Sequence, residues 1–125
     1  MATIDIDSEQ FEKTITDNDI VLVDFWADWC PPCKQFGPVF EAESESHSDI
    51  VFAKLDTDAN QSLSGQLGVS SIPTLMAFRE GVLVFNQAGA LQAPQLKQVV
   101  NAVKELDMEK VHAEVAKMQQ EHGHA

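Results

Sequence analysis

The two cysteines of the chain lie three positions apart in the stretch Trp29-Cys30-Pro31-Pro32-Cys33-Lys34. An apolar run over residues 20–26 precedes this stretch, and a helical pattern follows it. A strand, a tight turn and a helix whose first turn carries two thiols are together typical of thiol–disulfide chemistry. This motif constrains the fold closely, because a buried strand and the start of a helix have to meet at the cysteines.

Composition and charge exclude several classes of function. The chain has 125 residues and a net charge of −12, and no basic patch that would neutralise nucleic-acid phosphates or an anionic membrane surface. We attribute this charge mainly to solubility, with selection of basic partners as the alternative. No apolar run approaches the ~20 residues that span a bilayer. Residues 1–7 lack the features of an export signal, so we expect a cytoplasmic protein, in which a lone cysteine pair is catalytic or metal-binding.

Hydrophobic periodicity and turn residues predict alternating strands and helices, followed by a hairpin and a further helix. Asp7 and Gln10 form a predicted capping box at the first helix. Pro38 lies inside the second helix, where we expect a kink and not a break. Strands are predicted over 3–6, 20–26, 50–56, 74–78 and 82–85, and helices over 8–16, from the motif to about 47, over 61–67, and from 94 onward. The fold class is therefore α/β, with a mixed sheet between two layers of helices.

The positions of the two cysteines suggest different roles. Cys30 lies at the helix N-terminus, where unpaired amides and the helix dipole favour a thiolate, and we expect it to be the more exposed thiol. It is therefore the predicted attacking sulfur. Cys33 lies one turn later, close enough to close a disulfide that resolves a mixed disulfide with the substrate. Because only two residues separate the cysteines, such a bond restricts the unfolded chain little and is suited to cycling.

Asp24 is the candidate proton acceptor for Cys33. It is the only ionisable residue of the run 20–27, and burial would raise its pKa towards neutrality. Lys54 lies within a second apolar run and is a candidate partner for Asp24. The alternative is that both side chains reach solvent at the ends of their strands.

These residues resemble the thioredoxin family. The resemblance rests on Asp24-Phe25-Trp26-Ala27, Trp29-Cys30, Pro32-Cys33-Lys34, Pro38, Ser71-Ile72-Pro73-Thr74, Gly81 and Gly89, and it covers about residues 3–106. It implies a three-layer sandwich around a central five-stranded mixed sheet, with a thioredoxin domain over 1–106. The resemblance does not extend to residues 107–125, which we expect to form a C-terminal helical extension and tail. It also implies a protein-disulfide reductant without a bound cofactor, recharged by an NADPH-dependent flavoprotein reductase (thioredoxin reductase) and acting on disulfide-containing proteins.

The resemblance assigns roles position by position. Cys30 resembles the nucleophile and Cys33 the resolving cysteine, while Asp24 resembles the buried acid and Lys54 its neighbour. Pro73 resembles a cis-proline that faces the disulfide, and the backbone of Ile72 would pair with an extended substrate. The residues expected to bind substrate are Trp29, Pro31, Pro32, Ile72, Pro73 and Gly89.

Pro31 departs from the family pattern, which has glycine between the first cysteine and Pro32. Proline has no N–H, so one potential donor near the Cys30 sulfur is absent. A hydrogen bond to a charged group contributes about 1.5–3 kcal/mol, and ~30 mV corresponds to ~1.4 kcal/mol for two electrons. We therefore expect a potential shifted by tens of millivolts and still within the range of reductants.

Residues 107–125 extend past the family pattern. Apolar residues at 108, 111, 115 and 118 step by three and four, and Asp107 could cap a separate helix. Three alternatives are open: a helix packed back on the domain, a continuation of the preceding helix used in self-association, or a frayed end. We favour packing for 107–118, disorder from about 120, and a monomer. His47, His112, His122 and His124 are interpreted as surface or tail residues and not as metal ligands.

Three rival functions share these features. A disulfide oxidase or isomerase would use the same fold and both cysteines. A zinc or scaffold module would need two more ligands, and no second ligand pair is evident in the sequence. A partner that binds without redox chemistry remains a third alternative.

Overall fold

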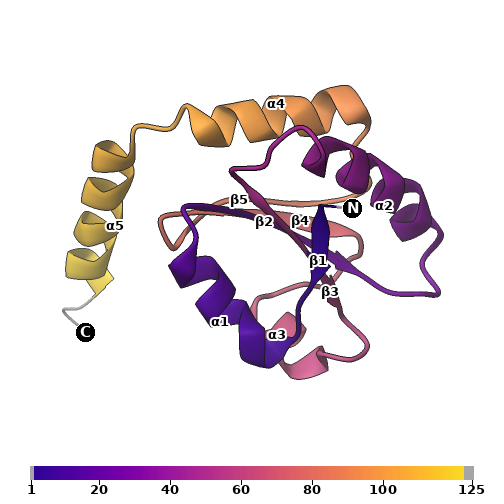
Figure 1. The fold of residues 1–125 in the computed structure, drawn as a ribbon. Helices are drawn as coiled ribbons and strands as arrows, with labels where there is room; N and C mark the ends of the chain where they lie inside the picture. The colour runs from indigo at the N-terminus through magenta and orange to yellow at the C-terminus, as the bar shows by residue number, and fades with distance from the viewer. Residues whose placement is uncertain (1, 123–125) are drawn as a thin grey trace.

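The computed structural model describes residues 2–122 and contains the predicted elements in the predicted order (Figure 1). The strands are β1 (Thr3–Asp5), β2 (Ile20–Trp26), β3 (Val51–Asp56), β4 (Thr74–Arg79) and β5 (Val82–Ala88). The helices are α1 (Ser8–Asp17), α2 (Pro31–Ser44), α3 (Gln61–Gln66), α4 (Ala93–Lys104) and α5 (Met108–His122).

The five strands form one mixed sheet in the order β1-β3-β2-β4-β5. β3 is parallel to β1 and β2, while β4 is antiparallel to β2 and β5. Helices α2 and α4 cover one face of the sheet, and α1 and α3 lie on the other (Figure 1). The predicted α/β sandwich is confirmed, and it places the central strand β2 directly before α2.

The side chains of β2 alternate between two apolar clusters. Val21, Val23 and Phe25 pack with the residues of α1, whereas Leu22 packs with those of α2 and α4. Because successive side chains of a strand point to opposite faces, Asp24 shares the face of Leu22. The carboxyl group of Asp24 therefore lies on the side of the sheet that α2 covers.

The helix signals of the sequence are confirmed with small shifts. Asp7 accepts from the Gln10 N–H, and the Gln10 side chain accepts from the Asp7 N–H, which completes the capping box. Helix α2 runs through Pro38 without a break. It ends at Ser44, three residues before the predicted limit, because the next amides bond to carbonyls three residues back in tighter turns.

The β4–β5 hairpin turns at Glu80 and Gly81, whose φ angles are 51° and 79°. Positive φ at both central residues is the mark of a type I′ turn, which matches the twist of paired strands. β5 continues to Ala88, three residues beyond the predicted end. The strand thus runs from this turn to the neighbourhood of Gly89.

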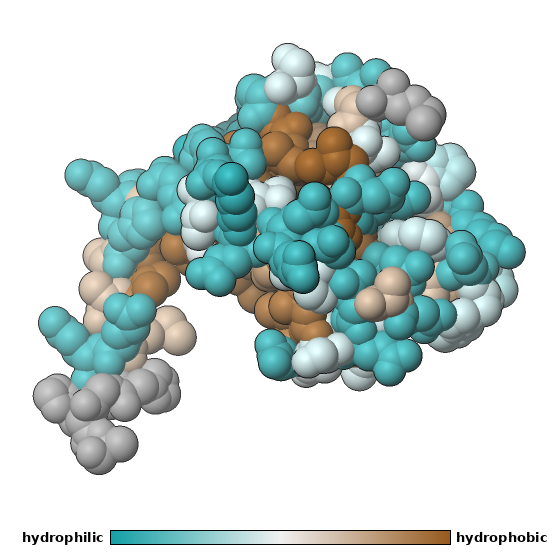
Figure 2. Space-filling model, turned by 60° about the horizontal axis from the view of Figure 1, so that its bottom comes forward, coloured by the Kyte–Doolittle hydropathy of each residue, from teal (hydrophilic) through white to brown (hydrophobic). Residues whose placement is uncertain are grey.

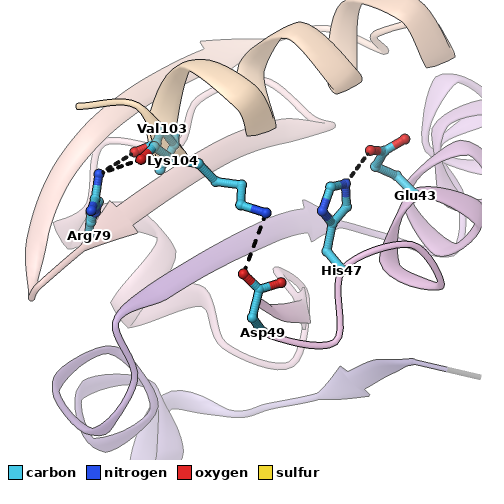
Figure 3. Close-up of polar contacts among 6 residues, drawn as sticks. All are labelled: Glu43, His47, Asp49, Arg79, Val103 and Lys104. Atoms are coloured by element: carbon cyan, nitrogen blue, oxygen red, sulfur yellow. Dashed lines mark hydrogen bonds and ion pairs between the residues drawn. The ribbon is translucent and has the colours of Figure 1, made fainter.

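Arg79 joins the hairpin to the end of α4. Its guanidinium Nη1 donates to the backbone carbonyls of Val103 and Lys104 at 2.9 and 3.0 Å (Figure 3). The same Nη1 also donates to the Leu106 carbonyl at 3.0 Å. These carbonyls belong to the last turn of α4 and the residues after it, where carbonyl groups have no intrahelical N–H donor. The side chain of Lys104 reaches Asp49 at 3.4 Å in the same region.

α5 is a separate helix, which contradicts the continuous-helix alternative. Asp107 precedes it, and its Oδ1 lies 3.4 Å from the Lys110 N–H. Met108 is buried and Val111 and Val115 are half-buried, whereas Met118 is 54% exposed, so α5 packs on the domain to about Val115 and not to its end. Figure 2 shows α5 projecting from the body of the molecule. The helix reaches residue 122, so the prediction of disorder from about residue 120 is wrong for residues 120–122. The side chain of His122 and the whole of His124, which were predicted to be tail residues, lie outside the described residues.

His47 is not the surface residue predicted from the sequence. Its side chain is 13% exposed, and its Nε2 lies 2.6 Å from Oε2 of the buried Glu43 (Figure 3). The ring also stacks on Phe52. This arrangement follows from the turn after α2, which folds His47 back over the sheet.

Within residues 2–122, no helix is long and apolar enough to cross a membrane. Over the same residues, no group of three or more His, Cys, Asp or Glu side chains is arranged to hold a metal ion. His112 instead pairs with Glu80 at 2.8 Å, which ties α5 to the hairpin turn.

Candidate functional site

The cysteine motif begins where β2 ends. The Cys30 N–H donates to the Ala27 carbonyl at 3.3 Å, which turns the chain from the sheet into α2. Cys30 is the N-cap of α2, with extended backbone angles. Pro31 and Pro32 occupy the first two helical positions, where the missing N–H groups cost no intrahelical hydrogen bond. The two prolines therefore fix the start of the helix at the first cysteine.

Cys30 and Cys33 are joined in a disulfide across the first turn of α2, with their Cα atoms 5.2 Å apart. The Cys33 N–H donates to the Cys30 Sγ at 3.2 Å. Amides at the second and third helical positions are the usual partners of an N-cap side chain, and Pro32 has none to offer. The Cys33 amide and the dipole of α2 are thus the features that favour negative charge on this sulfur.

The relative exposure of the two cysteines differs from the prediction. Cys30 is 2% exposed and Cys33 is 5% exposed, so both residues are buried and Cys30 is not the more exposed of the two. The carbonyl oxygen of Ile72 lies 3.5 Å from the Cys30 Sγ, and the loop at residues 72–73 therefore covers it. The prediction that Cys30 is the attacking sulfur therefore rests on its position at the N-terminus of α2 and not on its exposure.

Asp24 is fully buried beneath the motif. Neither of its carboxylate oxygens has a hydrogen-bond partner among the described residues. Burial raises the pKa of Asp24 from 3.8 to about 7, while the charge of Lys54 acts in the opposite direction. The alternative in which Asp24 reaches solvent is therefore wrong. A carboxyl group with a pKa near 7 can accept and return a proton at neutral pH.

Lys54 lies beside Asp24 on the neighbouring parallel strand, where the two residues are paired in register. Its Nζ lies 5.2 Å from the centre of the Trp26 ring. A Cβ atom added at Gly37, one turn after Cys33 in α2, would lie 3.8 Å from the same Nζ. Lys54 thus reaches across the sheet face to the part of α2 that follows the resolving cysteine.

A groove of about 570 Å³ opens along this side of α2. Both Cys33 and Lys54 line it, so solvent can approach the second cysteine next to the buried acid. The lining residues are Trp26, Ala27, Asp28, Cys33, Lys34, Gly37, Pro38, Glu41, Ala42, Glu45 and Lys54.

Trp29 stands beside the disulfide and is 66% exposed. Its indole N–H donates to Oδ2 of Asp58 at 2.8 Å, and this contact holds the exposed ring in place. Sequence reasoning missed Asp58. Its position just after β3 is the signal that would have found it, because the carboxyl ends of parallel β2 and β3 meet at one edge of the sheet.

The loop opposite the motif completes the site. The Ile72–Pro73 peptide bond is cis, and the Gly89 N–H donates to the Pro73 carbonyl at 2.8 Å. Gly89 has a φ of 109°, a conformation that favours glycine. These contacts bring Ile72, Pro73 and Gly89 to the side of the disulfide that Cys30 faces.

Comparisons with known proteins agree with this geometry. The thioredoxin family model matches residues 2–102. The chain is 49% identical over 122 residues to "Putative thioredoxin 2" of Streptomyces coelicolor, covering 98% of this chain and 91% of that protein. It is 37% identical to the thioredoxin of Bacillus subtilis, over 81% of this chain and 97% of that protein. The structure of a mutant thioredoxin from Halobacterium salinarum superposes with a TM-score of 0.75 at 36% identity, covering 83% of this chain and 91% of that one.

Proposed function

The chain belongs to the thioredoxin family and is a thiol–disulfide reductant, and from this premise we propose the role of each residue at its site. The oxidase or isomerase alternative is not favoured by these relatives. One observation carries the assignment: the Cys30–Cys33 disulfide closes across the first turn of α2, with the Cys33 amide directed at the Cys30 sulfur. In this state the protein has already given up its two electrons.

Cys30 acts as the nucleophile of the reduced protein. Its thiolate attacks one sulfur of a substrate disulfide, a mixed disulfide forms, and the other substrate sulfur leaves as a thiolate. Cys33 then gives its proton to Asp24, and its sulfur attacks the Cys30 sulfur of the mixed disulfide. The second substrate thiolate is released and the Cys30–Cys33 bond forms. Two cysteine sulfurs are oxidised and two substrate sulfurs are reduced, so the electrons balance.

Asp24 and Lys54 take part in the proton transfer of the second step. The buried carboxylate accepts the proton from Cys33, and the groove along α2 lets that proton exchange with solvent. Lys54 keeps part of the Asp24 population ionised at neutral pH, because its positive charge opposes the effect of burial.

The substrate lies against the rim formed by Trp29, Pro31, Pro32, Ile72, Pro73 and Gly89. Trp29 offers an exposed aromatic surface, and Asp58 orients it. The backbone of Ile72, next to the Cys30 sulfur, pairs with an extended substrate segment around the disulfide.

The oxidised protein is recharged by a dithiol of thioredoxin reductase, an NADPH-dependent flavoprotein that supplies two electrons and two protons. The protein itself needs no bound cofactor, acts on disulfide-containing proteins as a monomer, and works in the cytoplasm, where thiols are kept reduced.

Insulin reduction coupled to NADPH oxidation tests this proposal. The unaltered chain, Cys30→Ser, Cys33→Ser and Asp5→Asn are compared with the same reductase, the last as a variant that keeps both cysteines and changes an exposed residue of β1. Turnover is expected to be lost in both cysteine variants and retained in Asp5→Asn. NADPH oxidation that persists in Cys30→Ser would overturn the assignment, and refolding of scrambled ribonuclease faster than insulin reduction would favour an isomerase.

A further inference from the structure

A second groove, of about 350 Å³, lies between the edge strand β5 and helix α4. Its lining residues are Val84, Phe85, Gln87, Leu91, Gln95, Gln98, Val99, Ala102, Val103 and Leu106. Not one of these residues is charged, although the whole chain carries a net charge of −12. The rim residues proposed to bind substrate beside the disulfide are absent from this lining, so the groove is a separate surface.

The strand beside this groove is open on its outer side over its second half, residues 85–88, whereas residues 82–84 line a pocket shared with Val111 and Val115 of α5. β5 is the last strand of the sheet, and its seven residues contain no charge and no proline. Exposed edges are usually shortened or protected by charged residues, because their free backbone groups pair with other chains. The opposite edge, β1, has only three residues and ends in Asp5. β5 is therefore the less protected of the two edges.

The groove adjoins the catalytic loop. Ala88 of β5 pairs with Thr74, and the Gly89 N–H bonds to the Pro73 carbonyl. The preceding residue, Ile72, contacts the Cys30 sulfur through its carbonyl oxygen. Gln87 and Leu91, on either side of Gly89, line the near end of the groove. A chain held at Ile72 thus reaches the groove within a few residues.

We propose that this groove binds an uncharged, apolar stretch of the polypeptide whose disulfide is being reduced, in extended form beside β5. The inference rests on the proposed function and names its substrate class: unfolded or partly folded chains that expose apolar residues near their cysteines. A charged side chain would lose water there and gain no counter-ion. The five residues from Val84 to Ala88 span about 13 Å, which places the apolar stretch about four to six residues from the substrate cysteine.

A second copy of this chain is the competing occupant. Each copy carries a charge of −12, and like charges oppose association. An uncharged segment of another protein avoids this repulsion. Sedimentation at assay concentrations distinguishes the two, because a dimer that Ala102→Glu dissociates would assign the groove to self-association and overturn the proposal.

Ala102→Glu and Asn101→Glu form a matched pair for the test. Both residues are exposed in α4 and both changes add one negative charge, but only Ala102 lines the groove. Two disulfide peptides are compared that differ only in having Leu-Val or Ser-Asn five residues from the cysteine. We expect kcat/KM to favour the Leu-Val peptide about tenfold, the effect of burying roughly one aliphatic side chain. Ala102→Glu should remove this preference and Asn101→Glu should keep it.

Two controls separate the inference from the proposed function. Reduction of 5,5′-dithiobis(2-nitrobenzoate), which is too small to reach the groove, should be the same in all three proteins. Binding of a Leu-Val peptide with serine in place of cysteine, followed by NMR shifts of the groove residues, reports the groove without any redox step. If no disulfide substrate were reduced while the serine-containing Leu-Val peptide still bound in the groove, only the proposed function would be overturned. Equal kcat/KM values of the unaltered chain for the two peptides would overturn the proposed role of the groove. A preference for the Leu-Val peptide that is unchanged in Ala102→Glu would overturn it as well.

Discussion

Replacing Asp24 by asparagine should stabilise the protein, and the gain should grow with pH. The carboxyl group has a pKa of 3.8 in the unfolded chain and about 7 in the folded one, because burial disfavours its charge. Between these values the folded state retains a proton that the unfolded state has lost. The stability of the unaltered protein is therefore complete below pH 3.8, falls as the pH rises, and reaches its lower limit above pH 7.

The size of the effect follows from the two pKa values. A difference of about three pH units, at ~1.4 kcal/mol each, amounts to about 4 kcal/mol. Asparagine has nearly the same shape as the protonated acid and carries no charge. The free energy of unfolding of Asp24→Asn should therefore exceed that of the unaltered protein by about 2 kcal/mol at pH 5.5 and about 4 kcal/mol at pH 8.

Urea unfolding of the oxidised proteins, followed by tryptophan fluorescence from pH 5.5 to 8.5, measures this difference. Asp5→Asn is the matched control, because it removes the same charge from an exposed position on a strand. Its stability should differ little from that of the unaltered protein at any pH. A gain in Asp24→Asn that stays constant with pH, or that Asp5→Asn reproduces, would refute a buried carboxyl with a raised pKa.

Three further changes test other parts of the structure. Arg79→Met keeps the aliphatic stem and removes three hydrogen bonds to carbonyls, so it should lower the free energy of unfolding by about 2–3 kcal/mol in a urea titration; no change would show that these bonds contribute nothing. Pro31→Gly should move the redox potential by tens of millivolts at most, measured by equilibration with glutathione, and an oxidase-like value for either protein would contradict this. Truncation after Leu106 removes the buried Met108 and should lower the melting temperature by about 5–10 °C in a calorimetric scan, whereas an unchanged temperature would mean that α5 does not pack.

Local signals in the sequence predicted much of this architecture. The capping box at Asp7 and Gln10 depends on residues three positions apart, so the sequence is sufficient to predict it. The burial of Asp24 followed from the unbroken apolar run around it, which only a central strand accommodates. The pairing of Asp24 with Lys54 required only that two buried strands lie side by side in register.

Contacts between distant segments were beyond such reasoning. The exposure of Cys30 depends on a loop more than forty residues away, whose Ile72 carbonyl covers the sulfur. Asp58 and Arg79 form hydrogen bonds with residues of other elements, and the residues next to them in the sequence do not predict these partners. The position of His47 near the predicted end of α2 favours a surface side chain, yet the turn after α2 directs its ring onto Phe52.

Intact-mass spectrometry of Cys33→Ser after mixing with a disulfide peptide tests directly whether Cys30 attacks the substrate and Cys33 resolves the mixed disulfide. Without the resolving sulfur, the first step should leave one peptide half attached to Cys30, and dithiothreitol should release it. Attack by Cys30 predicts this adduct within the time of one normal turnover. A Cys33→Ser protein that stays unmodified, together with a Cys30→Ser protein that acquires the adduct on Cys33, would contradict it.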